Sequence, residues 1–228
     1  MKLCGISDLH GQINFDVKSC DVLCICGDIL PLDIQMNSRA SKKWLREKFL
    51  TWCLKQDAEI IILVGGNHDF YLFNHPAEVK EIFEGTKVKY LWDETLTYLD
   101  ADGKSFKFYG TPWCHQFGSW AFMGYTDEGL KSVFDRIPED IDVLVTHDAP
   151  YGCSDVCFEH YRHARRTEHI GSPALRDAIL EKKPKLCLHG HLHTSNHEKE
   201  NLGETDVYNV SLKNESYDLV FSPLYLTL

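Results

Sequence analysis

The stretch Glu59-Ile60-Ile61-Ile62-Leu63-Val64, followed at once by Gly65-Gly66-Asn67, indicates the fold class of the chain. After Glu59 it is continuously aliphatic, which is typical of a central strand that is covered on both faces. Two shorter apolar runs, residues 2–7 and 21–26, precede it. An amphipathic helix is expected between the second run and this strand, at 38–56, with an N-cap from the serine-rich start. This order of strand, helix and strand predicts a parallel α/β fold.

The remaining pattern continues this arrangement along the chain. Helices are expected at 75–84, 127–136 and 172–182, where Pro76 and Pro173 stand in the first turns. Strands are expected at 87–91, 95–99, 105–110, 141–146 and 185–188, and antiparallel strands near 205–211 and 217–228. Residues 101–104 read as a hairpin turn. We find no internal repeat and no linker, so we expect one globular domain over residues 1–228.

Composition limits the partners and the compartment. The 228 residues carry 24 Lys and Arg against 34 Asp and Glu, a net charge of −10, so a nucleic-acid partner is disfavoured. The N-terminus leaves no room for a signal peptide, and no apolar run reaches membrane-spanning length. Nine cysteines are an odd number, and several lie inside apolar runs, including Cys24 and Cys26. We therefore expect buried, reduced thiols and a cytoplasmic protein.

Five polar motifs follow predicted strands, at the point where each strand ends. In open α/β sheets, ligands gather in the crevice beyond the carboxyl ends of the strands, so the five motifs are expected to meet. A single histidine in a loop is usually a surface residue, and a single Gly-Asp is usually a turn, so the evidence is the ordered set. The motifs are Asp8-Leu9-His10, Gly27-Asp28, Gly66-Asn67-His68-Asp69, Thr146-His147 and Gly190-His191-Leu192-His193.

This mixture of carboxylate, amide and imidazole donors suits Mn²⁺, Fe, Zn²⁺ or Mg²⁺, and of these we take Mn²⁺ as the favoured ion. Two such ions could clamp a phosphoryl group and supply a bridging hydroxide as nucleophile, so no serine or cysteine nucleophile is needed. Asp28 could bridge the two ions. His68 could donate a proton to the leaving oxygen, and Asp69 could hold the His68 imidazole in position.

The same five motifs in the same order resemble the signature of the calcineurin-like metallophosphoesterases. The resemblance spans nearly the whole chain and implies a four-layer sandwich, in which two mixed β-sheets are flanked by helices. It also implies that His68 is the proton donor. One ion would be held by residues matching Asp8, His10, Asp28 and His193, and the other by Asp28, Asn67, His147 and His191.

A narrower resemblance rests on Tyr109-Gly110-Thr111-Pro112-Trp113 and on the stretch from His169 to Lys185. These features resemble the small metallophosphoesterase-domain proteins related to class III cyclic nucleotide phosphodiesterases. Two details depart from the family pattern. No acidic residue stands three places after Asp28, and Asp148 replaces a small residue after His147.

Candidate substrate contacts are of two kinds. The stretch 160–169 is the only basic concentration in an acidic chain, and its Arg162 and Arg165 suit phosphate, although a solvated helix or loop face is an equal alternative. Aromatic residues from Trp113 to Phe122, together with His115, could line a nucleobase site. Core packing is at least as good an interpretation for most of them, and a homodimer surface is another.

These observations predict a dinuclear metal-dependent phosphoesterase that hydrolyses small phosphodiesters, with cyclic nucleotides leading by resemblance, or phosphomonoesters. Two alternatives stay open. A nuclease of the same superfamily is disfavoured by the acidic charge. A metal-bound regulatory module with weak catalysis is disfavoured by the complete set of ligands together with His68.

Overall fold

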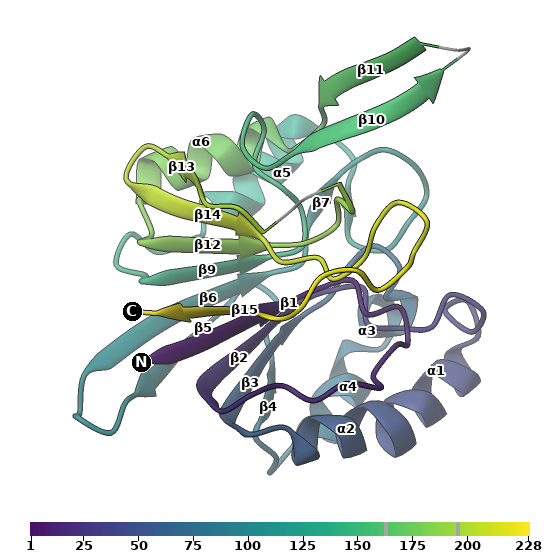
Figure 1. Ribbon diagram of the computed structural model, residues 1–228, viewed down its shortest axis with the longest axis vertical. Coiled ribbons are helices and arrows are strands. Elements are labelled where there is room, and N and C mark those ends of the chain that lie inside the picture. Colours follow the sequence, from purple (N-terminus) through teal and green to yellow (C-terminus); the bar gives the residue numbers. More distant parts are fainter. Residues whose placement is uncertain (162–163, 195–196) are drawn as a thin grey trace.

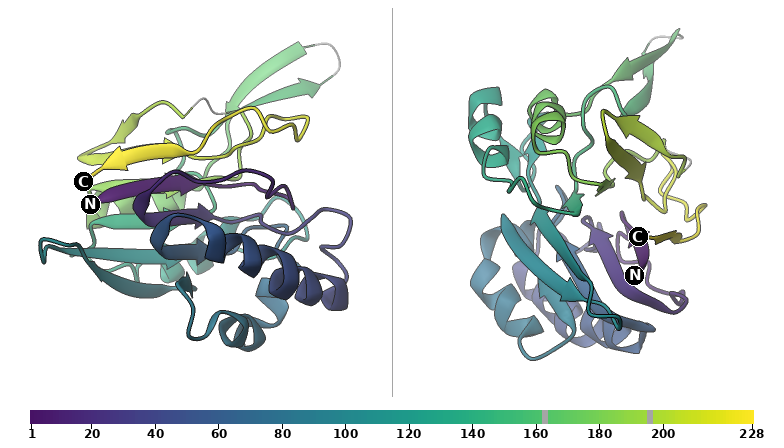
Figure 2. Two further views of the ribbon diagram at one scale, coloured as in Figure 1. Left: turned by 60° about the horizontal axis from the view of Figure 1, so that its bottom comes forward. Right: turned by 90° about the vertical axis from the view of Figure 1, so that its left-hand side faces the viewer.

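The computed structural model describes residues 1–161, 164–194 and 197–228, with the side chains of 157–167 excepted. Two β-sheets are stacked face to face, and helices cover the outer face of each (Figure 1). The expected four-layer sandwich is therefore confirmed. The two ends of the chain lie side by side, and the Met1 amino group donates a hydrogen bond to the Leu228 carbonyl oxygen over 3.1 Å (Figure 2).

The first sheet has the strand order β15-β1-β2-β3-β4. Strands β1 to β4 are parallel, and only β15 runs antiparallel to its neighbour β1. The continuous aliphatic run forms β3, which pairs with a strand on each side as expected of a central strand. The bounds are β1 (Lys2–Ile6), β2 (Cys20–Cys26), β3 (Ala58–Val64), β4 (Val88–Tyr90) and β15 (Leu224–Thr227).

The second sheet has the strand order β13-β14-β12-β9-β6-β5. Its four inner strands are parallel, and the edge strands β13 and β5 are antiparallel to their neighbours. A small pair, β7 (Cys114–His115) and β8 (Met123–Gly124), lies outside both sheets. The bounds are β5 (Glu94–Leu99), β6 (Ser105–Thr111), β9 (Val143–Thr146), β12 (Leu186–His189), β13 (Glu200–Leu202) and β14 (Thr205–Asn209).

Helices α1 (Ser38–Trp44), α2 (Leu50–Lys55), α3 (Phe70–Asn74) and α4 (Pro76–Phe83) pack on the first sheet. Helices α5 (Asp127–Phe134) and α6 (Pro173–Lys182) cover the second sheet. A π-helical segment, η1 (Leu45–Phe49), joins α1 to α2, so the predicted helix 38–56 is continuous but not α-helical throughout. None of the helices in the described part of the chain has the length and apolar character that crossing a bilayer requires.

Strand alternation explains how three apolar layers form. On β2, Leu23 and Ile25 face the helices of the first sheet, whereas Cys24 and Cys26 face the second sheet. On β12, Leu188 faces the first sheet and Cys187 faces α5 and α6. The described cysteines are all free and buried, as expected. Each sheet is thus apolar on both faces, and polar side chains can gather only at its ends.

Several sequence expectations are corrected by the structure. The strand expected near 205–211 to be antiparallel is β14, which is parallel to its neighbour β12. It is antiparallel only to β13, a strand that the sequence did not predict. The predicted strand 217–228 is limited to β15, and Tyr217 lies in the loop before it. The short helix α3 was also missed, because its aromatic residues follow a site motif and show no clear helical period.

The described residues of the basic stretch, 160–161 and 164–169, lie in a hairpin of β10 (Val156–Tyr161) and β11 (Ala164–His169). The hairpin projects from the body of the molecule (Figures 1 and 2). Arg162 and the Arg165 side chain lie outside the described residues. A second basic group, with Arg39, Lys42 and Arg46, lies on α1 and η1, so the stretch 160–169 is not the sole basic concentration.

Candidate metal centre

The five sequence motifs arrive at one edge of the sandwich. Asp8 follows β1, Asp28 follows β2, Asn67 follows β3, His147 follows β9 and His191 follows β12. All five strands belong to the parallel parts of the two sheets, so their carboxyl ends point the same way (Figure 1). The first sheet brings mainly oxygen donors, and the second brings imidazoles.

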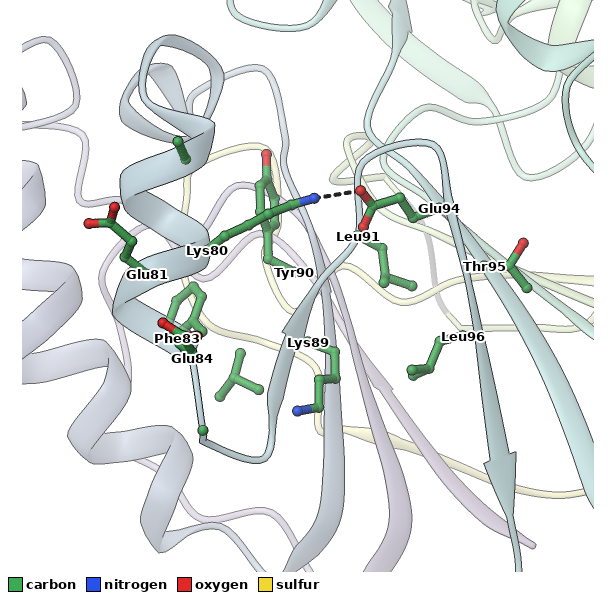
Figure 3. A pocket seen from close by; sticks show the side chains of 13 residues that line it. Lys80, Glu81, Phe83, Glu84, Lys89, Tyr90, Leu91, Glu94, Thr95 and Leu96 are labelled. Atoms are coloured by element: carbon green, nitrogen blue, oxygen red, sulfur yellow. Dashed lines mark hydrogen bonds and ion pairs between the residues drawn. The ribbon is translucent and has the colours of Figure 1, made fainter.

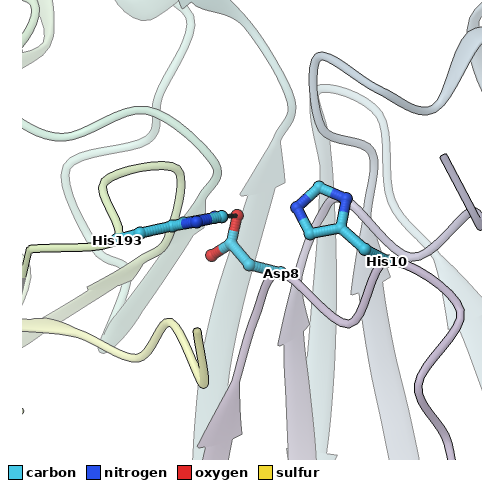
Figure 4. A group of neighbouring side chains, drawn as sticks. All are labelled: Asp8, His10 and His193. Carbon is cyan, nitrogen blue, oxygen red and sulfur yellow. Dashed lines mark ion pairs between the residues drawn. The ribbon is translucent and has the colours of Figure 1, made fainter. Parts of the chain in front are cut away.

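Asp8, His10 and His193 form one group of donors (Figure 4). Their nearest ligand atoms lie within 4.8 Å of one another, close to the spacing of roughly 4 Å for donors on opposite sides of one ion. The His193 Nε2 atom is 3.3 Å from Asp8 Oδ1. The C-terminal motif thus meets the N-terminal motif across the interface between the two sheets.

Asp8, Asp28 and His147 form a second group with the same spacing. The Asp28 Oδ2 atom is 3.4 Å from His147 Nε2 and 3.8 Å from His10 Nε2, so one carboxylate oxygen faces both groups. Asn67 Oδ1 is 2.9 Å from His147 Nε2. The His191 ring is beside His147, with ring centroids 5.1 Å apart. All seven predicted ligands are therefore brought together.

Unpartnered buried atoms show that the centre fits metal ions. Asp8 Oδ1 and both ring nitrogens of His10 are buried and have no hydrogen-bond partner. Burying such polar atoms without a partner costs about 1–3 kcal/mol each, so native proteins seldom leave them unmatched. A divalent cation would satisfy the Asp8 oxygen and one His10 nitrogen. The donor set of carboxylate, amide and imidazole also suits Mn²⁺, Fe or Zn²⁺.

Four of the candidate ligands have strained backbones. Asp8, His10, Asp28 and His191 have φ values of 58°, 43°, 53° and 69°, in the left-handed region that side-chain-bearing residues seldom adopt. Such conformations cost of order 1–3 kcal/mol each and persist only where the surroundings impose them. Each occurs directly after a buried strand. The turns therefore aim the ligand side chains at the common centre rather than along the strand.

Gly190 allows the second sheet to approach the first. A Cβ atom at this position would be 1.9 Å from Ser7 Oγ and 2.6 Å from Asp8 Oδ2. The backbone amide of His191 donates a hydrogen bond to the same Asp8 oxygen over 3.1 Å. Strand alternation does not apply to His191, because β12 ends at His189 and His191 lies in the following loop. Turn geometry, not alternation, separates His191 from His193.

Burial and charge set the protonation of the metal-free centre. Burial opposes ionisation of Asp8 and Asp28, yet His193 and His147 respectively hold the pKa of each carboxyl below its usual range. Burial also works against a charge on His147, but Asp28 outweighs it and raises the His147 pKa to about 10. Burial lowers the pKa of His10 to about 4. In the metal-free centre, a proton on His147 therefore balances the negative charge of the carboxylates. A bound cation would take over this role.

Two ligand histidines are oriented by backbone carbonyls. His147 Nδ1 donates to the Cys26 carbonyl oxygen over 2.7 Å, and His193 Nδ1 donates to the Asn214 carbonyl oxygen over 3.1 Å. A hydrogen bond at Nδ1 fixes the ring and turns Nε2 toward the centre. Asn214 was not recognised from the sequence, because a backbone carbonyl leaves no sequence signal.

His68 lies beside the ligands, and its partner differs from the one expected. Its Nδ1 atom is 2.6 Å from Gln35 Oε1, and its Nε2 atom is 4.0 Å from Asp28 Oδ2. The expectation that Asp69 holds the His68 ring is therefore corrected. The Asp69 carboxylate instead accepts hydrogen bonds from the backbone amides of Ile29, Leu30 and Gly66. Asp69 fixes the turns that carry Asp28 and Asn67.

His115 and Trp113 behave differently as candidate substrate contacts. His115 Nδ1 is 2.8 Å from the buried carboxylate of Asp148, which raises the His115 pKa against the opposing effect of burial. Its ring lies 6.5 Å from that of His191. Trp113 instead donates through Nε1 to Asp93 over 3.0 Å and packs beside Trp92. His115 is therefore at the centre, whereas Trp113 is a packing residue.

A surface cavity of about 530 Å³ lies between α4, β4 and β5. A Lys80–Glu94 ion pair of 2.5 Å crosses it (Figure 3). None of the candidate ligands lines this cavity. Its lining mixes apolar side chains such as Val88 and Leu96 with surface charges, so we look for the chemistry at the candidate metal centre.

Comparison with known proteins agrees with the fold and identifies the family. A family model described as calcineurin-like phosphoesterase matches residues 1–195, and the chain belongs to this family. Metallophosphoesterase domain-containing protein 1 of Homo sapiens is 26% identical, over 98% of this chain and 69% of its own length. Uncharacterized protein MJ1162 of Methanocaldococcus jannaschii is 24% identical, over 93% and 89% of the two lengths.

Solved structures show the same fold at lower identity. The phosphopantetheinyl hydrolase PptH of Mycobacterium tuberculosis superposes with a TM-score of 0.57, covering 95% of this chain and 90% of that chain. Its sequence identity to this chain is 13%, so the likeness concerns the fold alone.

Proposed function

We propose that the protein hydrolyses small phosphodiesters or phosphomonoesters with two divalent ions, and that Mn²⁺ is the first ion to test. The observation that carries the proposal is the convergence of seven donor side chains, among which Asp8 and His10 have buried polar atoms without a hydrogen-bond partner. Family membership supports metal-dependent phosphoester chemistry in general. Cyclic nucleotides lead among the diesters by sequence resemblance.

The ligands would divide between two ions, with Asp28 facing both. When bound, two such ions would polarise a phosphoryl group and lower the pKa of a water, so that hydroxide is available as the nucleophile near neutral pH. The chain supplies the orientation of each donor through strained turns and through carbonyl groups behind the histidines. The buried setting of Asp8 and Asp28 also strengthens every charge interaction there.

His68 is proposed as the proton donor to the leaving oxygen. The Gln35 oxygen accepts the hydrogen bond from His68 Nδ1–H, which leaves Nε2 as the nitrogen that exchanges a proton with substrate. Asp148 raises the pKa of His115 against the effect of burial, and a protonated His115 would attract the phosphate. The basic hairpin stays a further proposed phosphate contact.

The test is hydrolysis of bis-p-nitrophenyl phosphate by Mn²⁺-loaded protein. Asp28→Ala and Asn67→Ala each remove an oxygen donor and should lower turnover by more than about a hundredfold. Asp102→Ala, an exposed carboxylate in the β5–β6 turn, is the matched control. Undiminished turnover in both ligand variants would overturn the proposal. Salt-sensitive cleavage of single-stranded DNA, without activity on mononucleotides, would favour a nuclease.

A further inference from the structure

Three exposed aromatic rings lie against the histidines of the metal centre, and we name Phe117, Trp120 and Tyr217 the aromatic rim. Their residues are 46%, 37% and 38% exposed, so they are not buried in the core. The Phe117 ring is 5.0 Å from His191 and the Trp120 ring is 4.6 Å from His68. The rim therefore borders the centre on different sides.

Tyr217 completes the rim beside the other group of ligands. Its ring centroid is 5.0 Å from that of His10 and 4.9 Å from that of His193. The buried Lys213 donates through Nζ to the Tyr217 carbonyl oxygen over 2.9 Å. The Tyr217 backbone has a φ of 63°, so its exposed ring is held at the centre against a conformational cost.

The loop that carries Trp120 is tied to the centre. The backbone amide of Ala121 donates to the carbonyl oxygen of the ligand Asn67 over 3.0 Å. Gly118 lets the indole fold across the loop, because a Cβ there would be 2.9 Å from Trp120 Nε1. Phe70 also lies beside the indole, at 6.1 Å between ring centroids. Trp120 is therefore placed by the fold although its ring is partly exposed.

The chemistry of the centre indicates what the rings contact. A phosphoryl group bound at the centre would direct its organic group outward, between the rings that border the candidate ligands. Exposed aromatic rings bind flat groups by offset stacking or by edge contacts, and they gain nothing comparable from a small alkyl group. Trp120 adjoins His68, the proposed proton donor, so its neighbour in a bound ester is the leaving group.

We infer that the aromatic rim selects phosphoesters whose leaving group is a flat ring, and that Trp120 is the residue that contacts this ring. The inference rests on the proposed function and assigns its substrate class. In the reaction, the attacking water releases one proton to the solvent, its oxygen forms a new bond to phosphorus, and the ester P–O bond breaks. The proton on His68 passes to the leaving oxygen, while Trp120 holds the departing ring.

A binding experiment tests the selection without requiring turnover. Titration calorimetry on Mn²⁺-loaded protein would compare phenylphosphonate with methylphosphonate. We expect the phenyl compound to bind about tenfold more tightly, as a single aromatic contact allows. Trp120→Ala should abolish this preference and leave methylphosphonate affinity unchanged, whereas Trp120→Phe should keep most of it. Tyr125→Ala, which removes a ring that is 78% exposed, is the matched control.

Hydrolysis then separates this inference from the proposed function. The substrates are an aryl ester and a fluorinated alkyl ester whose leaving alcohols have matched acidity. Loss of about tenfold in kcat/KM for the aryl ester alone in Trp120→Ala supports the inference. An equal loss for both esters, an absent phenylphosphonate preference, or a Trp120-dependent change only in oligomeric state would overturn it. Ring-selective binding without any hydrolysis supports the inference and sinks the proposed function.

Discussion

The ligand cluster and the aromatic rim are neighbours, yet their construction differs. The cluster comes from the ends of five strands, is mostly buried, and contains four residues with strained backbones. The rim comes from two loops, and its three rings are more than a third exposed. In the cluster, strand ends and turns hold the side chains, and backbone carbonyls fix the rings of His147 and His193. In the rim, the backbone is fixed and the ring is left open.

This difference separates two tasks of the site. Rigid placement of donors serves the binding of ions and the chemistry, which tolerate small errors in position poorly. Open rings on anchored loops serve recognition, because a bound group can replace water on an exposed face. Changes in the cluster should therefore alter metal content and rate together, whereas changes in the rim should alter preference between substrates.

The largest effect is expected from His191→Gly. Removing this imidazole should weaken the binding of the ion beside His147. Binding of the ion beside Asp8, His10 and His193 should change little. Elemental analysis should find about one ion fewer per chain, and turnover should fall by more than about a hundredfold. His75→Ala, at the start of α4, serves as the control. Full metal content with full turnover would contradict the division of ligands.

A smaller effect is expected for the residues around the proton donor. His68→Ala should keep its ions and lose about 10²–10⁴ in rate, as removal of a general acid does. Gln35→Ala should lose about tenfold, because it only orients the His68 ring. Both losses should grow as the leaving group becomes poorer. The measurement is the rate on a series of aryl esters with leaving groups of different acidity, and the exposed Gln12→Ala is the control. If this role is wrong, the loss of rate will not depend on the leaving group.

The smallest effect concerns the stability of the metal-free protein. Burial lowers the pKa of His10 and of His191 from 6.5 to about 4, so the unfolded chain binds more protons between these values. Their contribution to the free energy of unfolding is present above pH 6.5 and is lost as the pH falls toward about 4. Calorimetry on chelator-treated protein should show a falling Tm across this window. The slope of Tm against pH should be smaller in His10→Asn. An unchanged slope would contradict the lowered pKa of His10.

The ligands could be predicted from the sequence because each one directly follows a strand with a clear apolar pattern. The positions of Asp8, Asp28 and Asn67 after β1, β2 and β3 then place them at one edge. The four-layer arrangement came from family resemblance, since short apolar runs do not reveal how sheets stack. Strand pairing such as β14 with β12 depends on contacts that no local pattern contains.

The surroundings of the ligands were less accessible to prediction. Asp69 adjoins His68 in sequence, but the turn directs its carboxylate to backbone amides, and Gln35 reaches His68 from a loop far away in the chain. Trp113 and Trp120 are similar in sequence context, yet one pairs with Asp93 and the other borders the centre. Such choices depend on loop geometry, which residue type and spacing do not encode.

The tight approach at Gly190 also has a genetic consequence. Every missense change of a glycine codon adds a Cβ atom, and at this position that atom would collide with Ser7 and Asp8. A single nucleotide change that alters the amino acid would thus push the two sheets apart at the point where Gly190 packs against Ser7 and Asp8. Deep mutational scanning should find no tolerated residue at this codon, in contrast to Gly129, an exposed position in α5 where a Cβ would come no nearer than 3.1 Å to Thr126 Oγ1.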